Sequence, residues 1–161
     1  MSKTYRVVAW STGNVGRHVI AGIDARPDLE LVGLWVSNPD KVGKDAGELA
    51  GLDRTLGVPA TNDADALFAL KPDAVIHTAM ADDRLFEALG DLQRILQAGI
   101  NVLSSGPVFL QYPWGVVDEG MITPTVEAAM AGGVSIFVNG VDPGFANDAL
   151  PLVLSLSLIH I

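Results

Sequence analysis

A short apolar run that meets a turn of small residues near the amino terminus constrains this chain more than any other feature. Residues 5–10 read Y-R-V-V-A-W, residues 11–16 read S-T-G-N-V-G, and residues 17–23 read R-H-V-I-A-G-I. This order predicts a strand, a tight turn and a helix. Backbone amides at such a helix start, together with the helix macrodipole, form a binding site for a pyrophosphate. The sequence therefore predicts a dinucleotide-binding turn.

The glycines of this turn match two of the three positions in the fingerprint G-x-G-x-x-G. Ser11 stands where the first glycine is expected, while Gly13 would allow close approach of a diphosphate and Gly16 would let the helix pack on the strand. Because the pattern is incomplete, its place between a strand and a helix carries the interpretation. An ordinary strand-to-helix turn is the alternative.

Composition narrows the possible partners. The chain has 161 residues, one domain's length, and a net charge of −9 with only ten scattered basic residues, which argues against a nucleic-acid partner. The absence of cysteine excludes disulfides and thiolate metal sites, and three histidines without an H-E-x-x-H motif argue against a zinc site. No secretory signal is visible in the first residues, so we expect a cytoplasmic location.

The carboxyl-terminal residues need a separate interpretation. Residues 150–161 are apolar but too short to span a bilayer, so no membrane partner is expected. The last six residues, L-S-L-I-H-I, are similar to a translated sequencing adapter. We therefore expect a dinucleotide-binding domain over residues 1–150, the start of a truncated second domain over 151–155, and a non-native tail over 156–161. A native terminal strand is the alternative for the tail.

Apolar runs alternate with helical patterns along the rest of the chain. The patterns predict strands at residues 5–10, 29–36, 74–78, 100–104 and 134–138, helices at 14–25, 63–70, 84–97 and 125–131, an irregular stretch at 41–61 with one helical turn at 46–50, and a loop at 107–120. Nearly uniform apolar strands indicate a parallel sheet covered on both faces. The expected fold class is α/β, a doubly wound parallel sheet of the Rossmann type.

Ligands of such sheets bind where the strands end. Ser37 and Asn38 follow the second strand, where domains that prefer NAD usually place an acid for the ribose 2′-hydroxyl. No carboxylate stands there, and Lys41 is nearby, which favours NADP or the use of both cofactors. The alternative is that these are ordinary turn residues.

Three further segments carry polar residues at strand ends. Thr78, Ala79 and Met80 could face the nicotinamide ribose. The alternation around His77 favours a histidine that is either buried or satisfied at the surface over a catalytic one. Asp142, in the run V-D-P-G-F, could face a substrate ammonium group as a catalytic carboxylate, or it could cap the following helix.

Two motifs together resemble a known family. V-V-A-W-S-T-G-N-V-G-R and N-G-V-D-P-G-F are similar to the N-terminal domain of dihydrodipicolinate reductase-like NAD(P)H-dependent oxidoreductases, in particular the amine dehydrogenase and 2,4-diaminopentanoate dehydrogenase group. The G-N-V-G and D-P-G elements are also similar to meso-diaminopimelate dehydrogenase. The resemblance implies a Rossmann domain followed by a C-terminal domain for substrate binding and dimerisation, which is missing here. It also implies a homodimer, a small-molecule substrate and hydride transfer to or from nicotinamide.

The resemblance also implies roles for individual residues. The pyrophosphate would bind at Ser11, Thr12, Gly13, Asn14 and Val15, the adenosine ribose at Ser37 and Asn38, the nicotinamide half at Thr78, Ala79, Met80, Ser104 and Ser105, and the substrate amine at Asp142, with Asp82 or Asp83 as a possible second carboxylate. One departure concerns Gly106–Leu110, where amine dehydrogenases of this group carry a glutamate and this chain has no acid.

These observations leave three functions open. The first is an oxidoreductase acting on a small amine/ketone or imine pair. The second is an NAD(P)-dependent reductase of a carbonyl or hydroxy substrate, which needs no acid beside a nitrogen. The third is a non-catalytic nucleotide-binding fragment. In each case we expect the face that would meet a second domain to expose apolar surface, including residues 150–154.

Overall fold

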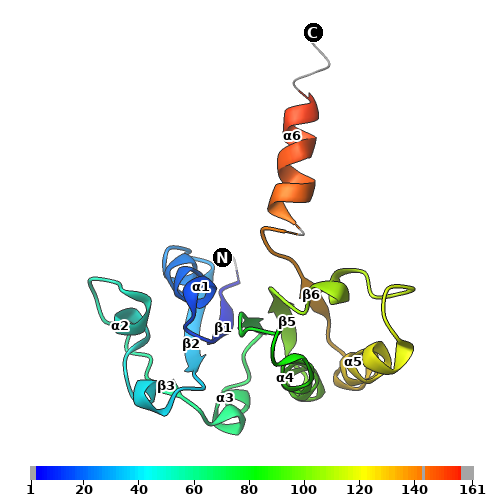
Figure 1. Cartoon of the computed structure of the whole chain (residues 1–161). Helices are drawn as coiled ribbons and strands as arrows, with labels where there is room; N and C mark the ends of the chain where they lie inside the picture. The colour runs from blue at the N-terminus through cyan, green and yellow to red at the C-terminus, as the bar shows by residue number, and fades with distance from the viewer. Residues whose placement is uncertain (1–2, 143, 157–161) are drawn as a thin grey trace.

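The computed structural model describes residues 3–142 and 144–156, and it contains one parallel sheet flanked by helices (Figure 1). The strand order is β3-β2-β1-β4-β5-β6. The strands are β1 (Tyr5–Trp10), β2 (Leu29–Trp35), β3 (Ala60–Thr61), β4 (Ala74–His77), β5 (Asn101–Ser104) and β6 (Ile136–Val138). Every neighbouring pair is parallel, and the order reverses between β1 and β4. The predicted doubly wound fold is confirmed.

Helices lie on both faces of this sheet. They are α1 (Asn14–Asp24), α2 (Ala46–Ala50), α3 (Ala64–Ala69), α4 (Leu85–Gln97), α5 (Glu119–Gly132) and α6 (Leu150–Leu156), with short 3-10 turns at Pro39–Lys41 and Val108–Gln111 and a π-turn at Phe145–Ala149. α1 and α2 pack on one face with Val7, Ala9 and Leu34 of the sheet. α3, α4 and α5 pack on the opposite face with Val8 and Val102. Two apolar cores therefore sandwich the sheet.

Local side chains explain where several helices begin. Asp63 caps α3 by accepting a hydrogen bond from the amide of Ala66, and Asp118 caps α5 through the amide of Gly120. Asp45 caps α2 and also accepts hydrogen bonds from Leu56, Gly57 and Val58. These backbone donors, Leu56 first, hold the pKa of the Asp45 carboxyl below its usual range. One carboxylate thus organises the stretch that the sequence indicated was irregular.

The structure corrects one predicted element bound and adds one strand. α5 begins at Glu119 rather than Thr125, because the Asp118 cap starts the helix early and Pro124 is accommodated inside it. β3 was not predicted, since a pair of residues beside Leu34 and Trp35 is too short to give a periodic pattern.

The expectation that both faces are covered is wrong for β5 and β6. On the side where α1 covers β1 and β2, no described helix packs over β5 and β6, and Leu103 and Phe137 are 44% and 61% exposed. Their strand neighbours Val102 and Val138 point to the covered face and are buried. Half of one sheet face therefore presents apolar side chains without a partner among the described residues.

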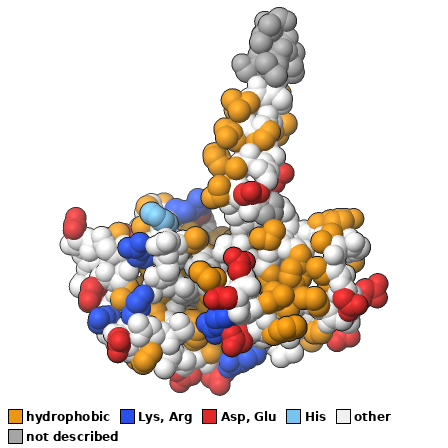
Figure 2. Space-filling view, viewed as in Figure 1, with side chains coloured by type: hydrophobic (Ala, Val, Ile, Leu, Met, Phe, Trp, Pro, Cys, Tyr) orange, Lys and Arg blue, Asp and Glu red, His pale blue; other side chains and the backbone are white. Residues whose placement is uncertain are grey.

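The last helix, α6, projects away from the sheet (Figures 1 and 2). Leu150, Leu152, Val153 and Leu154 on this helix are exposed, as the sequence predicted for residues 150–154. Leu156 ends the helix, and residues 157–161 of the predicted tail lie outside the described part of the chain. Within the residues described, no helix combines the length and apolar character needed to cross a bilayer.

Candidate functional site

The turn after β1 forms the centre of the candidate site. Ser11 has a φ of +97°, a left-handed conformation that favours glycine, so it carries the backbone geometry of the missing first glycine. Gly13 precedes α1 as its N-cap residue, and no side chain caps the helix in the described structure. The first amides of α1 are therefore free to bind an anion.

The two glycines of the turn do different things. A Cβ on Gly13 would meet nothing closer than the Ser11 hydroxyl at 3.7 Å, whereas a Cβ on Gly16 would lie 2.2 Å from the Ser11 carbonyl oxygen. Gly16 is thus required for the helix to pack against the turn, and Gly13 keeps the space above the amides open.

Lys41 brings a positive charge to the same turn. Its Nζ donates a hydrogen bond of 2.9 Å to the hydroxyl of Thr12, which is itself buried. Ser37 and Asn38 are exposed where β2 ends, but the Asn38 side chain accepts a hydrogen bond from the Asp40 amide and caps the turn Pro39–Lys41. The turn-residue interpretation therefore holds for the Asn38 oxygen, while Ser37 stays accessible.

A large hollow of about 650 Å³ lies on the uncovered face beside α1. Five predicted residues from distant segments line it together: Val15, Thr78, Ser104, Ser105 and Asp142. Its apolar wall includes Leu103 and Phe137 from the strands. The fold therefore brings these five residues to one hollow, and binding of the nicotinamide there stays a prediction.

Ser104 and Thr78 are held by internal hydrogen bonds. The Ser104 hydroxyl lies 3.1 Å from Nδ1 of His77 and within hydrogen-bond distance of the backbone carbonyls of His77 and Gly106, which compete for its single proton. The Thr78 hydroxyl donates to the Trp10 carbonyl at 3.1 Å. Internal hydrogen bonds therefore fix the side chains of Ser104 and Thr78 in the wall of the hollow. Ser105 is more accessible than Ser104, and its amide donates to the His77 carbonyl.

His77 is buried, as the sequence predicted. Burial lowers the pKa of His77 from 6.5 to about 4, so the ring is neutral at physiological pH. Its Nε2 has no hydrogen-bond partner among the described residues. The ring also faces Trp10 on the helix-covered side of the sheet. This position does not present His77 to the large hollow.

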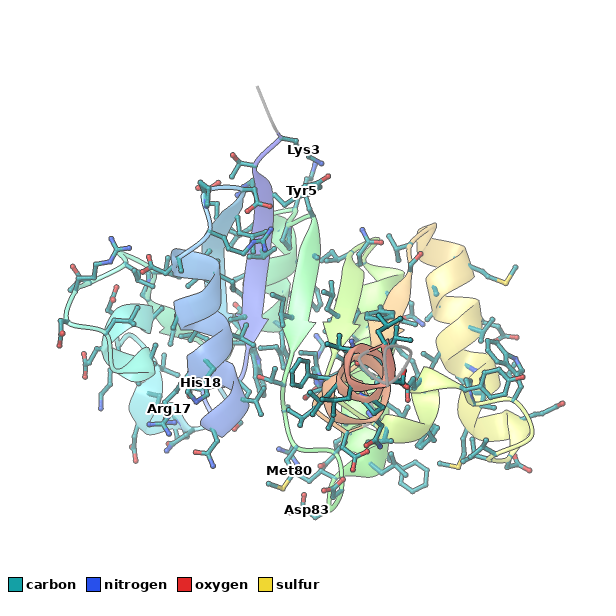
Figure 3. All side chains as sticks on the ribbon, turned by 90° about the horizontal axis from the view of Figure 1, so that it is seen from above. Lys3, Tyr5, Arg17, His18, Met80 and Asp83 are labelled. Atoms are coloured by element: carbon teal, nitrogen blue, oxygen red, sulfur yellow. The ribbon has the colours of Figure 1, made fainter. Side chains whose placement is uncertain are left out.

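Asp142 is exposed at the rim of the large hollow, and its carboxylate accepts a hydrogen bond from the Asn147 side chain. The following π-helix, Phe145–Ala149, has Gly144 at its N-cap position and no side-chain cap among the described residues, so the alternative that Asp142 caps this helix is wrong. Asp82 and Asp83 are also exposed, and Figure 3 shows Asp83 and Met80 at the end of the sheet where Arg17 and His18 of α1 lie, with Lys3 and Tyr5 at the other end.

A second, smaller hollow of about 180 Å³ lies on the opposite side of the glycine turn. Ser11 and Ser37 line it, as do Ala79 and Met80. The prediction grouped Ala79 and Met80 with Thr78, Ser104 and Ser105 on the nicotinamide side, but these two residues line the small hollow and not the large one. Arg84 and Asp91 of the α4 region also line it, although sequence reasoning assigned neither to the site. No motif marks them, because helical periodicity places them on a polar face and only the fold brings that face to the end of β2. In the part of the chain that the structure describes, no group of acidic or histidine residues could hold a metal ion.

The comparisons with known proteins confirm the predicted resemblance. Residues 6–83 match the family model of the dihydrodipicolinate reductase N-terminus. An amine dehydrogenase of Streptomyces virginiae is 46% identical over 148 residues, which are 92% of this chain and 41% of that protein. A 4-hydroxy-tetrahydrodipicolinate reductase of Trichormus variabilis is 46% identical over 61 residues, 38% of this chain and 22% of that protein. The relatives are thus an amine dehydrogenase and reductases.

Solved structures show the same fold. The amine dehydrogenase of Mycobacterium smegmatis is similar with a TM-score of 0.74 and 26% identity, covering 84% of this chain and 39% of that one. The WlbA dehydrogenase of Bordetella pertussis, solved with NADH and UDP-GlcNAcA, is similar with a TM-score of 0.60 and 20% identity, covering 86% of this chain and 36% of that one. The chain spans less than half the length of these relatives.

Proposed function

We propose that this dihydrodipicolinate reductase-like chain is the cofactor-binding domain of an NAD(P)-dependent oxidoreductase that acts on a small amine/ketone or imine pair. The observation that carries the proposal is the pair of hollows on either side of the uncapped start of α1. An extended dinucleotide has this shape, with its pyrophosphate between two heterocycles. The sequence relationship to an amine dehydrogenase over most of this chain supports the substrate class.

Each part of the site would hold a different part of the cofactor. The amides of Gly13 to Val15 would bind the pyrophosphate. Lys41, held beside the turn by its hydrogen bond to the Thr12 hydroxyl, would add a positive charge. Thr78 and Ser105 would border the nicotinamide half in the large hollow, and Ser37 the adenosine ribose. The nicotinamide would supply or accept the hydride. Asp142 would hold the substrate nitrogen by charge-assisted hydrogen bonding.

Titration with NADPH and NADH, followed by nicotinamide fluorescence, tests the cofactor site. We expect both to bind, and we expect Lys41→Gln to weaken the binding of each several-fold, with a smaller difference at high salt because salt screens exposed charges. Lys44→Gln is the matched control, since Lys44 is exposed and no hydrogen bond links it to the turn. Absence of binding to the unmodified chain would refute the proposal.

The absence of an acid between Gly106 and Leu110 favours a second candidate, reduction of a carbonyl or hydroxy substrate without amination. Ammonia separates the two reactions, because only reductive amination consumes it. NADPH oxidation that requires ammonia supports the amine reaction, and oxidation that does not require ammonia supports the carbonyl reaction. Binding without turnover on any carbonyl supports a non-catalytic nucleotide-binding chain.

The proposal extends to the architecture of the whole enzyme. A C-terminal domain that follows residues 1–150 would cover the exposed apolar face of β5 and β6 and close the large hollow, and the complete protein would form a homodimer. The exposed Leu103 and Phe137 side chains, and relatives more than twice as long, support this arrangement. A complete protein that sediments as a monomer would contradict the dimer.

A further inference from the structure

A buried pair of side chains, His77 and Ser104, joins the ends of two neighbouring strands beside the large hollow. The two residues are paired in register where β4 and β5 end, and both are buried. Nδ1 of His77 lies 3.1 Å from the Ser104 hydroxyl oxygen. Ser104 lines the large hollow, whereas His77 does not. The contact with Ser104 therefore links the buried ring to the wall of the hollow.

The hydrogen bonds around the Ser104 hydroxyl determine which nitrogen of His77 carries the proton. A hydroxyl donates one hydrogen bond and accepts two. The carbonyls of His77 and Gly106 compete for the Ser104 proton, and the Gly106 amide donates to the hydroxyl oxygen at 3.3 Å. If Nδ1 took that proton, both carbonyl oxygens would face the hydroxyl oxygen without a hydrogen between them. Nδ1 is therefore the donor, and it satisfies the remaining lone pair of Ser104.

The other ring nitrogen of His77 agrees with this assignment. Nε2 is buried and has no hydrogen-bond partner among the residues that the structure describes. Buried N–H groups without a partner are rarer in proteins than under-satisfied acceptors, so Nε2 is expected to carry a lone pair. The single N–H of a neutral imidazole then lies at Nδ1. Both ring nitrogens thus indicate the same tautomer.

Ser104 in turn holds the segment that follows β5. Its hydroxyl is hydrogen-bonded to the carbonyl and to the amide of Gly106. Ser105 lies between these two residues, lines the large hollow, and donates its amide to the His77 carbonyl at 3.1 Å. The His77 ring therefore restrains the position of Ser105 in the hollow through the Ser104 hydroxyl.

Resting on the proposed dinucleotide function, we propose that His77 is a positioning residue for the nicotinamide half of the cofactor. Its Nδ1–H orients the Ser104 hydroxyl, and this hydroxyl holds Ser105 and Gly106 where the nicotinamide half would contact them. Binding groups are held accurately only when hydrogen bonds behind them fix their geometry. The His77 side chain itself touches neither cofactor nor substrate.

Substitutions that keep or remove a donor at the Nδ1 position test this role. Asparagine can donate from that position, whereas leucine has a similar size and no donor. We would measure dissociation constants for NADH by nicotinamide fluorescence and for ADP-ribose, which lacks the nicotinamide half, by calorimetry. His77→Leu should weaken NADH binding roughly threefold to tenfold and ADP-ribose binding by less than about twofold, because one hydrogen bond behind the nicotinamide half is lost. His77→Asn should retain the affinity of the unmodified chain for both ligands.

Ser104→Ala tests whether His77 acts through Ser104. Removal of the hydroxyl should weaken NADH binding, and addition of His77→Leu to Ser104→Ala should then weaken it little further, because both changes break the same chain of hydrogen bonds. Losses that multiply in the double variant would show that His77 acts by another route, and the inference would be overturned.

Two further results would overturn the inference. A His77→Asn variant that loses as much NADH affinity as His77→Leu shows that the donor at Nδ1 is irrelevant. Equal losses for NADH and ADP-ribose show a general loss of structure. If His77→Leu does not fold, Ser104→Ala takes its place, and a selective loss of NADH binding is still expected for Ser104→Ala and not for His77→Asn. If the unmodified chain binds neither ligand, the proposed function itself fails, which is a distinct result.

Discussion

The two halves of the sheet differ in how they are enclosed. β1 and β2 have α1 and α2 on one face and α3 and α4 on the other, so their inward side chains are buried on both sides. β5 and β6 have helices on one face only in the described residues (Figure 1), and on the opposite face the apolar side chains of Leu103 and Phe137 are exposed. The small hollow lies in the enclosed half and the large one in the open half.

This difference suits the two halves of the sheet to different parts of the proposed site. Under the proposed function, the enclosed half would bind the adenosine side of the cofactor, because the small hollow lies there. The open half supplies one wall of a nicotinamide and substrate site and exposes the rest. Water would enter such an open site, so the second wall matters for chemistry more than for cofactor affinity.

Among the changes on the helix-covered side of the sheet, protonation of His77 should lower the free energy of unfolding the most. Because the folded-state pKa of about 4 lies below the ordinary 6.5, stability is present above pH 6.5 and is lost as pH falls toward 4. The loss should reach about 3 kcal/mol in the free energy of unfolding.

Denaturant titrations between pH 7 and pH 4 measure this loss. His77→Asn should remove this part of the pH dependence, while His18→Gln on the exposed surface of α1 should retain it. Equal pH profiles for His77→Asn and the unmodified chain would show that the His77 ring is not buried.

Gly16 tests how tightly the enclosed half is packed. Gly16→Ala should destabilise the chain by about 2–3 kcal/mol, because its Cβ would overlap the Ser11 carbonyl. Gly22→Ala in the same helix is the control, since a Cβ there meets nothing within 4 Å and should stabilise the chain by up to about 1 kcal/mol. Thermal unfolding distinguishes the two, and similar melting temperatures would contradict the close contact.

Substitutions at Val102 and Leu103 allow a direct comparison of the buried and exposed faces of β5. Val102→Thr places a hydroxyl in the core and should cost about 1–3 kcal/mol. Leu103→Thr lies on the open face, should change stability by less than about 0.5 kcal/mol, and should reduce self-association of the chain in light scattering. If Leu103→Thr costs as much as Val102→Thr, the face is covered in solution.

Ser11→Gly should have the smallest effect on the stability of the chain. Its positive φ is strained for serine, so Ser11→Gly should stabilise the chain by up to about 1 kcal/mol, offset in part by loss of the 3.3 Å hydrogen bond from the Gly13 amide. Cofactor affinity should be unchanged or improved, because the fingerprint is then complete. A lower melting temperature would show that the hydroxyl, not the backbone geometry, stabilises the turn.

The sequence by itself determined the fold class and the central turn. The fold class could be predicted because alternating apolar runs and helical patterns reflect burial within each segment. The turn could be predicted because Gly13 and Gly16 lie where a predicted strand leads directly into a predicted helix. The position of Thr78 beside this turn also followed from the rule that parallel strands end at one edge.

Only the tertiary structure decided which side chains complete the site. Asp91 and Arg84 line the same small hollow as Ser37, although 47 or more residues separate them in the sequence, a juxtaposition that no local pattern records. Ser104 turned out to be held by His77 and Gly106, and Asp142 by Asn147, since hydrogen-bond partners depend on geometry. The sequence likewise could not predict that one face of β5 and β6 is open, because an apolar strand has the same sequence whether or not a helix covers it.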